Sequence, residues 1–306
     1  MQISFCCKDA NAGIWLQELQ AALPQATVTP WQPGAAPADY AVVWAPPQQF
    51  FDEQPQLRAI FNVGAGVDAL MKLRLPAQAL VVRLDDSGMA VQMAEYVCHA
   101  VTRHVRELDA YEAQAAEGRW QHRTRRDRSA YPVGVMGLGV LGERVARALQ
   151  LFEFPVRGWS RTPKALAGVE CHAGMAALPA FLARCRVLVC LLPLTPDTQG
   201  ILNRDTLGQL LPGAYLINVA RGAHLVEEDL LALLASGHVA GATLDVFRTE
   251  PLPGEHPFWR HPQISVTPHI SAGTLPGKSI AQIVDKIRAL TRGEPITGLV
   301  DLQRGY

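Results

Sequence analysis

The amino-acid sequence predicts an α/β protein made of two domains, each built on a parallel sheet. Short β-branched runs alternate with amphipathic helical patterns from one end of the chain to the other. A second α/β unit, with its own glycine-rich phosphate-binding signature, begins at Tyr131. A length of 306 residues suits one large domain or two of moderate size. Strand, helix and strand repeated in this way give parallel sheets with helices on both faces.

The expected strands are short apolar or β-branched runs bounded by turn residues. In chain order they are residues 3–6, 40–44, 59–63, 80–84, 132–136, 156–160, 187–191, 214–219, 241–245 and 264–266.

The expected helices have apolar residues that recur every three or four positions, as at Leu141, Val145 and Leu149. Acidic residues 227–229 would stabilise the positive end of one helix dipole, and Gly237 offers a stop for that helix. The last long helix is expected to end at Gly293.

The domain division follows from a long helical pattern over residues 90–117 and the basic string at residues 122–128. We expect residues 1–99 with 278–306 to form the first domain and residues 100–277 to form the second. The periodicity alone does not require the last helix to return to the first domain. We interpret the basic string as a solvated linker rather than an anion site, because no aromatic residues interleave with its charges.

Composition excludes several classes of protein. Basic and acidic residues number 28 each, and 49% of the chain is hydrophobic, whereas disordered chains have few apolar residues and a large net charge. Zero net charge argues against a surface for nucleic acid or an anionic membrane. The expected partner is therefore a small molecule, with neither nucleic acid nor membrane involved.

The six cysteines are scattered, and none forms a CxxC pair with the spacing of a metal site, so no metal is expected. We interpret them as reduced core residues of a cytoplasmic protein. The first residues lack a cationic segment followed by a long apolar one, and no stretch reaches about 18 uninterrupted apolar residues. We therefore expect neither a secretory signal nor a membrane-spanning helix.

The glycine-rich signature lies between an apolar strand and a helix, and its spacing is GxGxxG: Gly137, Gly139 and Gly142. The first glycine permits a tight turn, and the second lets the backbone approach a pyrophosphate. The third lets the helix pack closely on the strand. In this context the signature predicts dinucleotide binding at the helix N-terminus.

The end of the following strand predicts which dinucleotide binds. An acidic residue about 20 positions on would bind the ribose hydroxyl of NAD, but the sequence there is GWSRTPK. The guanidinium of Arg161 matches a phosphate, and Ser160, Thr162 and Lys164 lie beside it. The sequence therefore predicts NADP(H).

Three polar residues follow the ends of different strands in the second unit. They are Arg221 in NVARG, Glu250 after LDVF and His269 in TPHI. Loops at the carboxyl ends of parallel strands hold ligands, so these side chains are expected to converge. Taken singly, each is more often an ordinary loop residue than a catalytic one.

Taken together, the ordered motifs resemble the D-isomer-specific 2-hydroxyacid dehydrogenase family over nearly the whole chain. GAGVD, the glycine signature, LLPLTPDTQGILN, NVARG, LDVF with EPLP, and TPHI occur in that family's order. VVWAPP, RLDDSGMAVQMAEY and the terminal RGY narrow the resemblance to the bacterial glyoxylate/hydroxypyruvate reductase A group. The resemblance implies two Rossmann/flavodoxin-like domains with a cleft between them.

The resemblance also implies catalytic roles. Arg221 would bind the substrate carboxylate and polarise the carbonyl of a 2-oxoacid. His269 would be the general acid in reduction, and Glu250 would orient it and favour its protonated form.

Further contacts are implied for cofactor and substrate. Cofactor contacts are expected from Leu138, Val140, Leu141, Leu192, Pro193, Thr198, Ala220 and Asp245. The amides of Val63, which precedes the GAGVD segment, and of Gly64, Ala65 and Gly66 within it are expected to converge on the substrate carboxylate. Trp44 and Met89 are candidates for the wall of the substrate pocket.

The function expected is NADPH-dependent reduction of glyoxylate and hydroxypyruvate, in a homodimer. By resemblance, the helix at residues 90–117 would serve as a dimer arm, and packing between the domains stays open as the alternative, because the sequence does not separate the two. A reductase of other small 2-oxoacids and a non-catalytic dinucleotide-sensing scaffold stay open as alternatives. A serine-pathway phosphoglycerate dehydrogenase is less attractive, because the chain ends soon after the last helix and Arg161 fits reduction.

Overall fold

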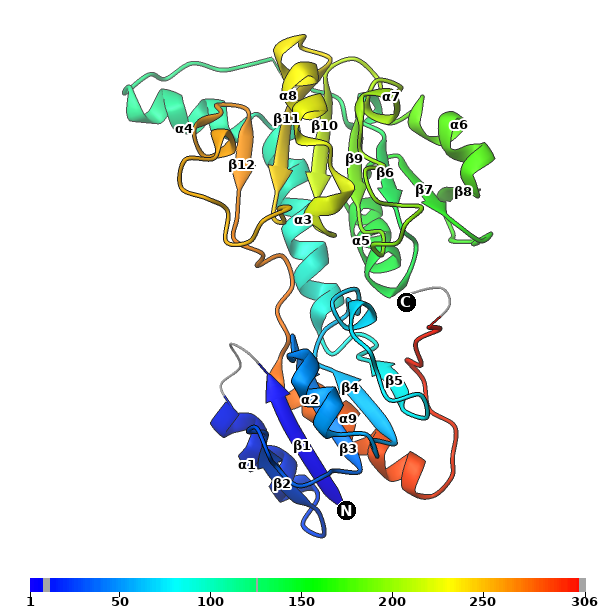
Figure 1. Cartoon of the computed structure of the whole chain (residues 1–306). Helices are drawn as coiled ribbons and strands as arrows, with labels where there is room; N and C mark the ends of the chain where they lie inside the picture. Colours follow the sequence, from blue (N-terminus) through cyan, green and yellow to red (C-terminus); the bar gives the residue numbers. More distant parts are fainter. Residues whose placement is uncertain (8–11, 125, 303–306) are drawn as a thin grey trace. The chain divides into compact units, whose positions relative to one another are not determined.

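The computed structural model describes residues 1–7, 12–124 and 126–302 (Figure 1). It divides into two compact units, one of Met1–Met89 with Thr274–Tyr306 and one of Ala90–Gly273. Each unit contains one sheet, and every strand pairing within the two sheets is parallel. The predicted α/β class with parallel sheets is confirmed.

The sheet of the first unit has the strand order β2-β1-β3-β4-β5, which is the flavodoxin-like order. Its strands are β1 (Gln2–Cys7), β2 (Thr27–Pro30), β3 (Tyr40–Trp44), β4 (Ala59–Asn62) and β5 (Leu80–Arg83). Alternate residues of β3 and β4 point to one side, where Val43 and Ile60 pack in a buried cluster with Phe50 and Phe51. Those two aromatics come from α2 (Gln48–Glu53).

The remaining helices of the first unit come from opposite ends of the chain. Helix α1 (Ala12–Ala22) contacts α9 (Pro276–Thr291), which buries Ile280, Ile283 and Ile287. The short helix η1 (Leu70–Lys72) completes this unit. The last helix therefore returns to the first unit.

The sheet of the second unit has the order β12-β11-β10-β9-β6-β7-β8, the doubly wound order of a Rossmann domain with an added edge strand. Its strands are β6 (Val133–Met136), β7 (Val156–Ser160), β8 (Val169–Ala173), β9 (Val187–Cys190), β10 (Ala214–Asn218), β11 (Val239–Leu244) and β12 (Ile264–Val266).

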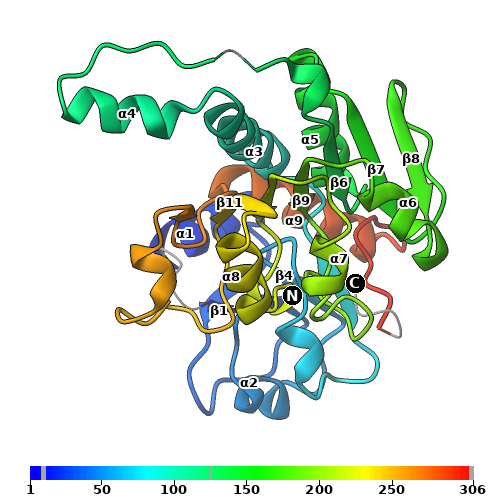
Figure 2. The same cartoon turned by 90° about the horizontal axis from the view of Figure 1, so that it is seen from above.

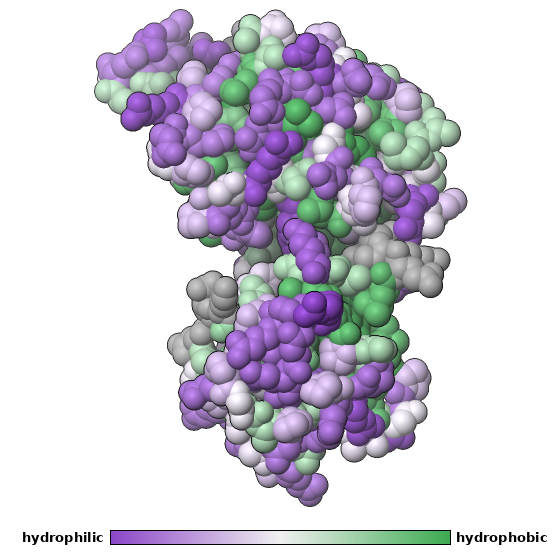
Figure 3. Space-filling model, viewed as in Figure 1, coloured by the Kyte–Doolittle hydropathy of each residue, from purple (hydrophilic) through white to green (hydrophobic). Residues whose placement is uncertain are grey.

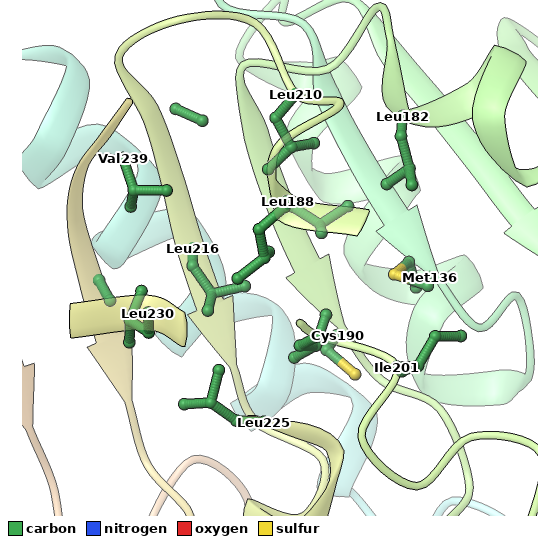
Figure 4. Packing of buried hydrophobic residues seen from close by; sticks show 14 of the residues in the cluster. Met136, Leu182, Leu188, Cys190, Ile201, Leu210, Leu216, Leu225, Leu230 and Val239 are labelled. Carbon is green, nitrogen blue, oxygen red and sulfur yellow. The ribbon is translucent and has the colours of Figure 1, made fainter. Parts of the chain in front are cut away.

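Both faces of this second sheet are buried by helices. Leu188 and Cys190 of β9 pack toward α6 (Leu178–Leu182), α7 (Arg204–Leu207) and α8 (Glu227–Ala235), as Figure 4 shows for part of this cluster. Val187 and Val189 of the same strand pack toward α3 (Met89–Val105) and α5 (Val140–Leu151). The alternation follows from the two-residue repeat of a strand. Short helices η2 (Arg128–Ala130), η3 (Met175–Ala177), η4 (Gly222–His224) and η5 (Pro257–Arg260) lie in connecting segments.

The expectation of a single helix over residues 90–117 is wrong. Helix α3 ends at Val105, and α4 (Leu108–Ala116) begins after Glu107, whose φ of 52° lies in the left-handed region. The Glu107 carboxylate pairs with Arg123 at 2.7 Å and Arg126 at 2.6 Å, so part of the basic string is tied to this break. Helix α4 extends away from the sheet of its own unit (Figures 1 and 2), and its visible face is mostly hydrophilic (Figure 3).

Two edge strands and both division points between the units differ from expectation. The edge strands β2 and β8 were not expected, and the units divide at Met89/Ala90 and Gly273/Thr274 rather than at 99/100 and 277/278. The first division shifts because nearly all of α3 packs on the second sheet, as Val97 and Val101 show. Among the described residues, no helix has both the length and the hydropathy to cross a bilayer.

Candidate active site

Most of the predicted functional residues of the second unit lie just beyond the carboxyl ends of its strands. In chain order, Gly137 follows β6, Arg161 follows β7, Pro193 follows β9 and Arg221 follows β10. The strand order reverses between β6 and β9, and ligands of doubly wound sheets bind at such a switch point.

The glycine turn has the geometry that each glycine was expected to supply. Gly137 has a φ of 101°, and a Cβ there would lie 2.7 Å from the Leu191 carbonyl oxygen. A Cβ at Gly142 would lie 1.7 Å from the Gly137 carbonyl oxygen, so the helix and turn approach too closely for a side chain. No described atom lies within 4 Å of a Cβ built at Gly139. That open space is where the backbone can meet a pyrophosphate.

The neighbouring residues of the turn differ in exposure. Gly139 is the N-cap of α5 and has no side chain with which to cap the helix. Leu138 is buried against Gly158, so only its backbone can meet a ligand. Val140 is exposed and Leu141 half-buried. These features fit a dinucleotide phosphate at the start of α5.

The loop after β7 fits the 2′-phosphate of NADP. Arg161, Thr162 and Lys164 are exposed, and no acidic residue occurs in the segment GWSRTPK. The hydroxyl of Ser160 donates to the Thr162 carbonyl oxygen at 2.7 Å and so holds the loop.

A threonine within the segment after β9 holds that segment through hydrogen bonds. The Thr198 hydroxyl donates to the Pro193 carbonyl oxygen at 2.7 Å and accepts from the Thr195 amide at 2.8 Å. Leu192 is buried and Pro193 exposed. Their predicted cofactor contacts stay predictions.

Arg221 is presented by a tightly held turn after β10. The buried Asn218 side chain accepts from the Ala220 amide at 3.2 Å and donates to the Arg221 carbonyl oxygen at 3.1 Å. A Cβ at Gly222 would lie 1.9 Å from the Phe247 carbonyl carbon, so only glycine permits this approach of the turn to the segment after β11. The Arg221 side chain is half-buried and donates to the Ala220 carbonyl oxygen at 2.7 Å.

Glu250 and His269 meet as the sequence predicts. Glu250 Oε2 lies 2.8 Å from His269 Nδ1, and Glu250 Oε1 accepts from the Phe247 amide at 2.9 Å. The two side chains remain 35% and 41% exposed, so the pair is open to a ligand.

Glu250 and His269 each shift the pKa of the other. The hydrogen bond to Glu250 raises the pKa of His269 above its ordinary value, outweighing the opposite effects of burial and of Arg221. Burial acts to raise the pKa of Glu250, but the bonds from His269 and the Phe247 amide, with the charges of His269 and Arg221, bring that pKa below its usual value. The two shifts favour the ionised carboxylate of Glu250 and the protonated imidazole of His269. Arg221 interacts electrostatically with both groups.

Asp245 holds the loop that carries His269. Its buried carboxylate accepts from the Thr267 hydroxyl at 2.6 Å, the Ile270 amide at 2.8 Å and the Ser271 amide at 2.8 Å. Its carbonyl oxygen accepts from the His269 amide at 2.9 Å, and His269 has a φ of 56°. Such a backbone conformation is unfavourable for histidine and needs support from its surroundings. The predicted contact of Asp245 with a nicotinamide stays a prediction.

The GAGVD segment of the first unit is held through its carbonyl groups. The buried Asn62 amide donates to the Gly64 carbonyl oxygen at 3.0 Å and to the Gly66 carbonyl oxygen at 2.9 Å. The Thr274 hydroxyl donates to the Val63 carbonyl oxygen at 2.8 Å. With these carbonyls engaged, the segment can direct amides toward an anion.

The expectation that Val63 contributes an amide to this anion site is wrong. Its N–H donates to the Val43 carbonyl oxygen at 3.0 Å, because the ladder between β3 and β4 continues one residue further. Gly64, Ala65 and Gly66 stay predicted contributors.

The two predicted pocket-wall residues differ in exposure. Trp44 is half-buried, and a Cβ at Gly64 would lie 2.4 Å from its indole ring, so the ring lies directly on the GAGVD segment. Met89 is only 4% exposed. Among the described residues, no group of three or more His, Cys, Asp or Glu side chains is placed to hold a metal ion.

Comparison with known proteins decides the family. The sequence model of the "D-isomer specific 2-hydroxyacid dehydrogenase, NAD binding domain" matches residues 98–271. The glyoxylate/hydroxypyruvate reductase A of Yersinia enterocolitica is 47% identical over 313 aligned residues, which cover all of both chains. The chain belongs to the D-isomer specific 2-hydroxyacid dehydrogenase family. The same reductase of Serratia proteamaculans is also 47% identical over the full length of both chains.

Solved structures of this dehydrogenase family share the fold over the whole chain. The family member from Xanthobacter autotrophicus Py2, in complex with NADPH and MES, has a TM-score of 0.95 and 43% identity and covers 100% of this chain and 99% of its own. The NADPH-dependent glyoxylate/hydroxypyruvate reductase of Sinorhizobium meliloti, in complex with NADP and sulfate, has a TM-score of 0.94 and 35% identity with the same coverage. The predicted family and two-domain Rossmann-type fold are confirmed.

Sequence reasoning missed the residues that hold the site's backbone in this dehydrogenase. Asn62 and Asn218 each end a strand and use a buried side-chain amide to brace the loop that follows. An asparagine as the last residue of an apolar strand, directly before a glycine-containing loop, is the signal that could have revealed both.

Proposed function

We propose that this chain reduces glyoxylate to glycolate and hydroxypyruvate to D-glycerate with NADPH. The observation that carries the proposal is the His269 to Glu250 hydrogen bond of 2.8 Å, with Arg221 acting electrostatically on both, at the sheet end that bears the glycine turn. The named relatives and the NADPH-bound and NADP-bound neighbours support the same reaction.

Each of the three side chains has a separate task in this reaction. NADPH, when bound, supplies the hydride to the substrate carbon. His269 donates a proton to the substrate oxygen from Nε2, because Nδ1 is engaged by Glu250. Arg221 binds the substrate carboxylate and stabilises the negative charge that develops on the oxygen. Glu250 keeps the imidazole oriented and protonated until the proton is used.

The two units divide the binding work. We assign cofactor binding to the unit Ala90–Gly273, with the glycine turn under the pyrophosphate and Arg161 and Lys164 beside the 2′-phosphate. We assign further substrate contacts to the other unit: the amides of residues 64–66 would donate to the carboxylate, and Trp44 would restrict the size of the 2-oxoacid. Asn62 supports this assignment, because it holds the carbonyls of that segment away from an anion.

A panel of small 2-oxoacids assayed by absorbance with NADPH and with NADH tests the proposal. We expect glyoxylate and hydroxypyruvate to give higher kcat/KM than larger 2-oxoacids, and NADPH to exceed NADH. A higher kcat/KM for a larger 2-oxoacid would show that glyoxylate and hydroxypyruvate are not the preferred substrates. Tight NADPH binding without turnover of any 2-oxoacid would favour a dinucleotide-sensing scaffold, and a preference for NADH would remove the role given to Arg161.

We also propose a cytoplasmic homodimer. All six cysteines are free thiols, and Cys98, Cys185 and Cys190 are buried, which suits a reducing compartment. Helix α4 extends from its unit with only Gln114 buried, and Trp120 at the end of this arm is 93% exposed. A large exposed aromatic on an extended arm supports contact with a second copy of the chain.

A further inference from the structure

A buried histidine joins two loops of the candidate active site. His224 is 0% exposed and lies at the end of the one-turn helix η4. Its Nδ1 lies 3.0 Å from the Arg221 carbonyl oxygen, and its Nε2 lies 3.3 Å from the Pro193 carbonyl oxygen. The two carbonyls follow different strands, β10 and β9.

Both contacts require the ring to donate. Carbonyl oxygens only accept, and a neutral imidazole carries a single N–H, whereas an imidazolium carries two. A ring that links both carbonyl oxygens must therefore carry a proton on each nitrogen. With a proton on Nε2 alone, the Nδ1 lone pair would face the Arg221 carbonyl oxygen at 3.0 Å.

Other side chains support each carbonyl separately, and His224 links the two. Asn218 donates to the Arg221 carbonyl oxygen at 3.1 Å, and Thr198 donates to the Pro193 carbonyl oxygen at 2.7 Å. The backbone around His224 is itself secured, because its carbonyl oxygen accepts from the Leu202 amide at 2.9 Å. A change at the ring therefore alters the link between the loops while these supports remain.

We propose that His224 is a positioning residue that couples the backbone of Arg221 to the cofactor-side segment at Pro193. The inference rests on the proposed function, which assigns Arg221 to the substrate carboxylate and the segment at Pro193 to NADPH. It predicts that the two ring nitrogens support different ligands: Nδ1 supports the 2-oxoacid and Nε2 supports NADPH.

A matched pair of substitutions separates the two nitrogens. The amide N–H of His224→Asn replaces Nδ1–H, and that of His224→Gln replaces Nε2–H. We expect H224N to raise the Kd for NADPH roughly three- to tenfold, the range for one lost hydrogen bond, while the Kd of its NADPH complex for oxamate stays near that of the parent. We expect H224Q to show the reverse.

The control is His238→Asn. The Nε2 of His238 lies 3.2 Å from the Leu207 carbonyl oxygen in the same unit, and His238 precedes β11, at the strand end opposite to the one that leads to Asp245. We expect this variant to leave both Kd values unchanged. Equal effects of H224N and H224Q on both ligands, or no effect on either, would overturn the coupling role.

A measurement on the unaltered chain decides the same point if a variant fails to fold. Nitrogen-15 NMR of histidine-labelled protein without cofactor should show both ring nitrogens of His224 protonated, and a ring protonated at only one nitrogen would leave one carbonyl unlinked and overturn the proposal. Failure of the proposed function is distinguishable, because it would appear as absent 2-oxoacid turnover by the parent. The NMR result and NADPH binding would still report on His224.

Discussion

The hydrogen bond between His269 and Glu250 is the feature most open to test by a single substitution. In the proposed mechanism, reduction needs protonated His269, and the bond to Glu250 raises the pKa of His269, so the protonated acid persists to higher pH. Activity should therefore fall as pH rises through this raised pKa. Glu250→Gln can still accept the hydrogen bond but removes the negative charge.

We expect E250Q to move the falling limb of the pH profile of kcat to lower pH. Activity above that limb should drop roughly tenfold for each pH unit of displacement. The control is Glu294→Gln, which removes an exposed carboxylate paired with Arg292. A limb that stays in place in E250Q would remove Glu250 from control of His269.

At the same scale, the sequence revealed residues that act through their own chemistry better than residues that act on the backbone. His269, Glu250 and Arg221 stand in recognisable motifs beyond strand ends, and the structure brings Glu250 and His269 into contact. Asn62 offers only the weaker signal of an asparagine at a strand end, and His224 offers none, because their partners are carbonyl oxygens whose positions depend on the folded loops. Val63 was predicted wrongly for the same reason, since its amide continues a ladder.

Among elements, the contact between the start of α5 and the glycine turn is the closest in the cofactor signature. A Cβ at Gly142 would lie 1.7 Å from the Gly137 carbonyl oxygen, so Gly142→Ala must displace helix or turn. Overpacking of this kind costs typically about 1–3 kcal/mol. We expect a fall in Tm of several degrees, at roughly 2–4 °C per kcal/mol, with weaker NADPH binding.

Gly277→Ala is the matched control for this element. Gly277 lies in the first turn of α9, and no described atom lies within 4 Å of a Cβ built there. Alanine at a compatible position restricts the unfolded chain, so an unchanged or slightly raised Tm is expected. Calorimetry and NADPH titration of both variants test the contact, and a G142A variant that matched the parent in both would contradict it.

The elements that sequence patterns missed are those with the least buried surface. Central strands such as β9 are buried on both faces and appear as apolar runs. The edge strand β2, with sequence TVTP, is mostly exposed, so its pattern is weak. The break at Glu107 was missed because helix-forming residues continue on both sides and glutamate is not a helix breaker.

Over the whole molecule, a neutral balance of charge conceals local excesses. The 28 basic residues offset 28 acidic ones, yet Arg161 and Lys164 lie together after β7 with no acidic residue in their segment. Part of the remaining basic charge is neutralised at the base of the arm, where Glu107 pairs with Arg123 and Arg126. Net charge therefore does not reveal where an anionic cofactor would bind.

The arm formed by α4 and the segment that follows it provides the prediction that concerns the whole molecule. Sedimentation equilibrium should give twice the chain mass of 33.3 kDa if α4 and its following segment contact a second copy. Trp120→Ala should shift the association toward monomer, because large aromatic residues contribute strongly at interfaces. Trp259→Ala, which removes a 47% exposed tryptophan from η5, is the control and should leave the mass unchanged. A parent chain that sediments as a monomer at micromolar concentration would reject the homodimer. A W120A variant that stays dimeric would place the contact elsewhere.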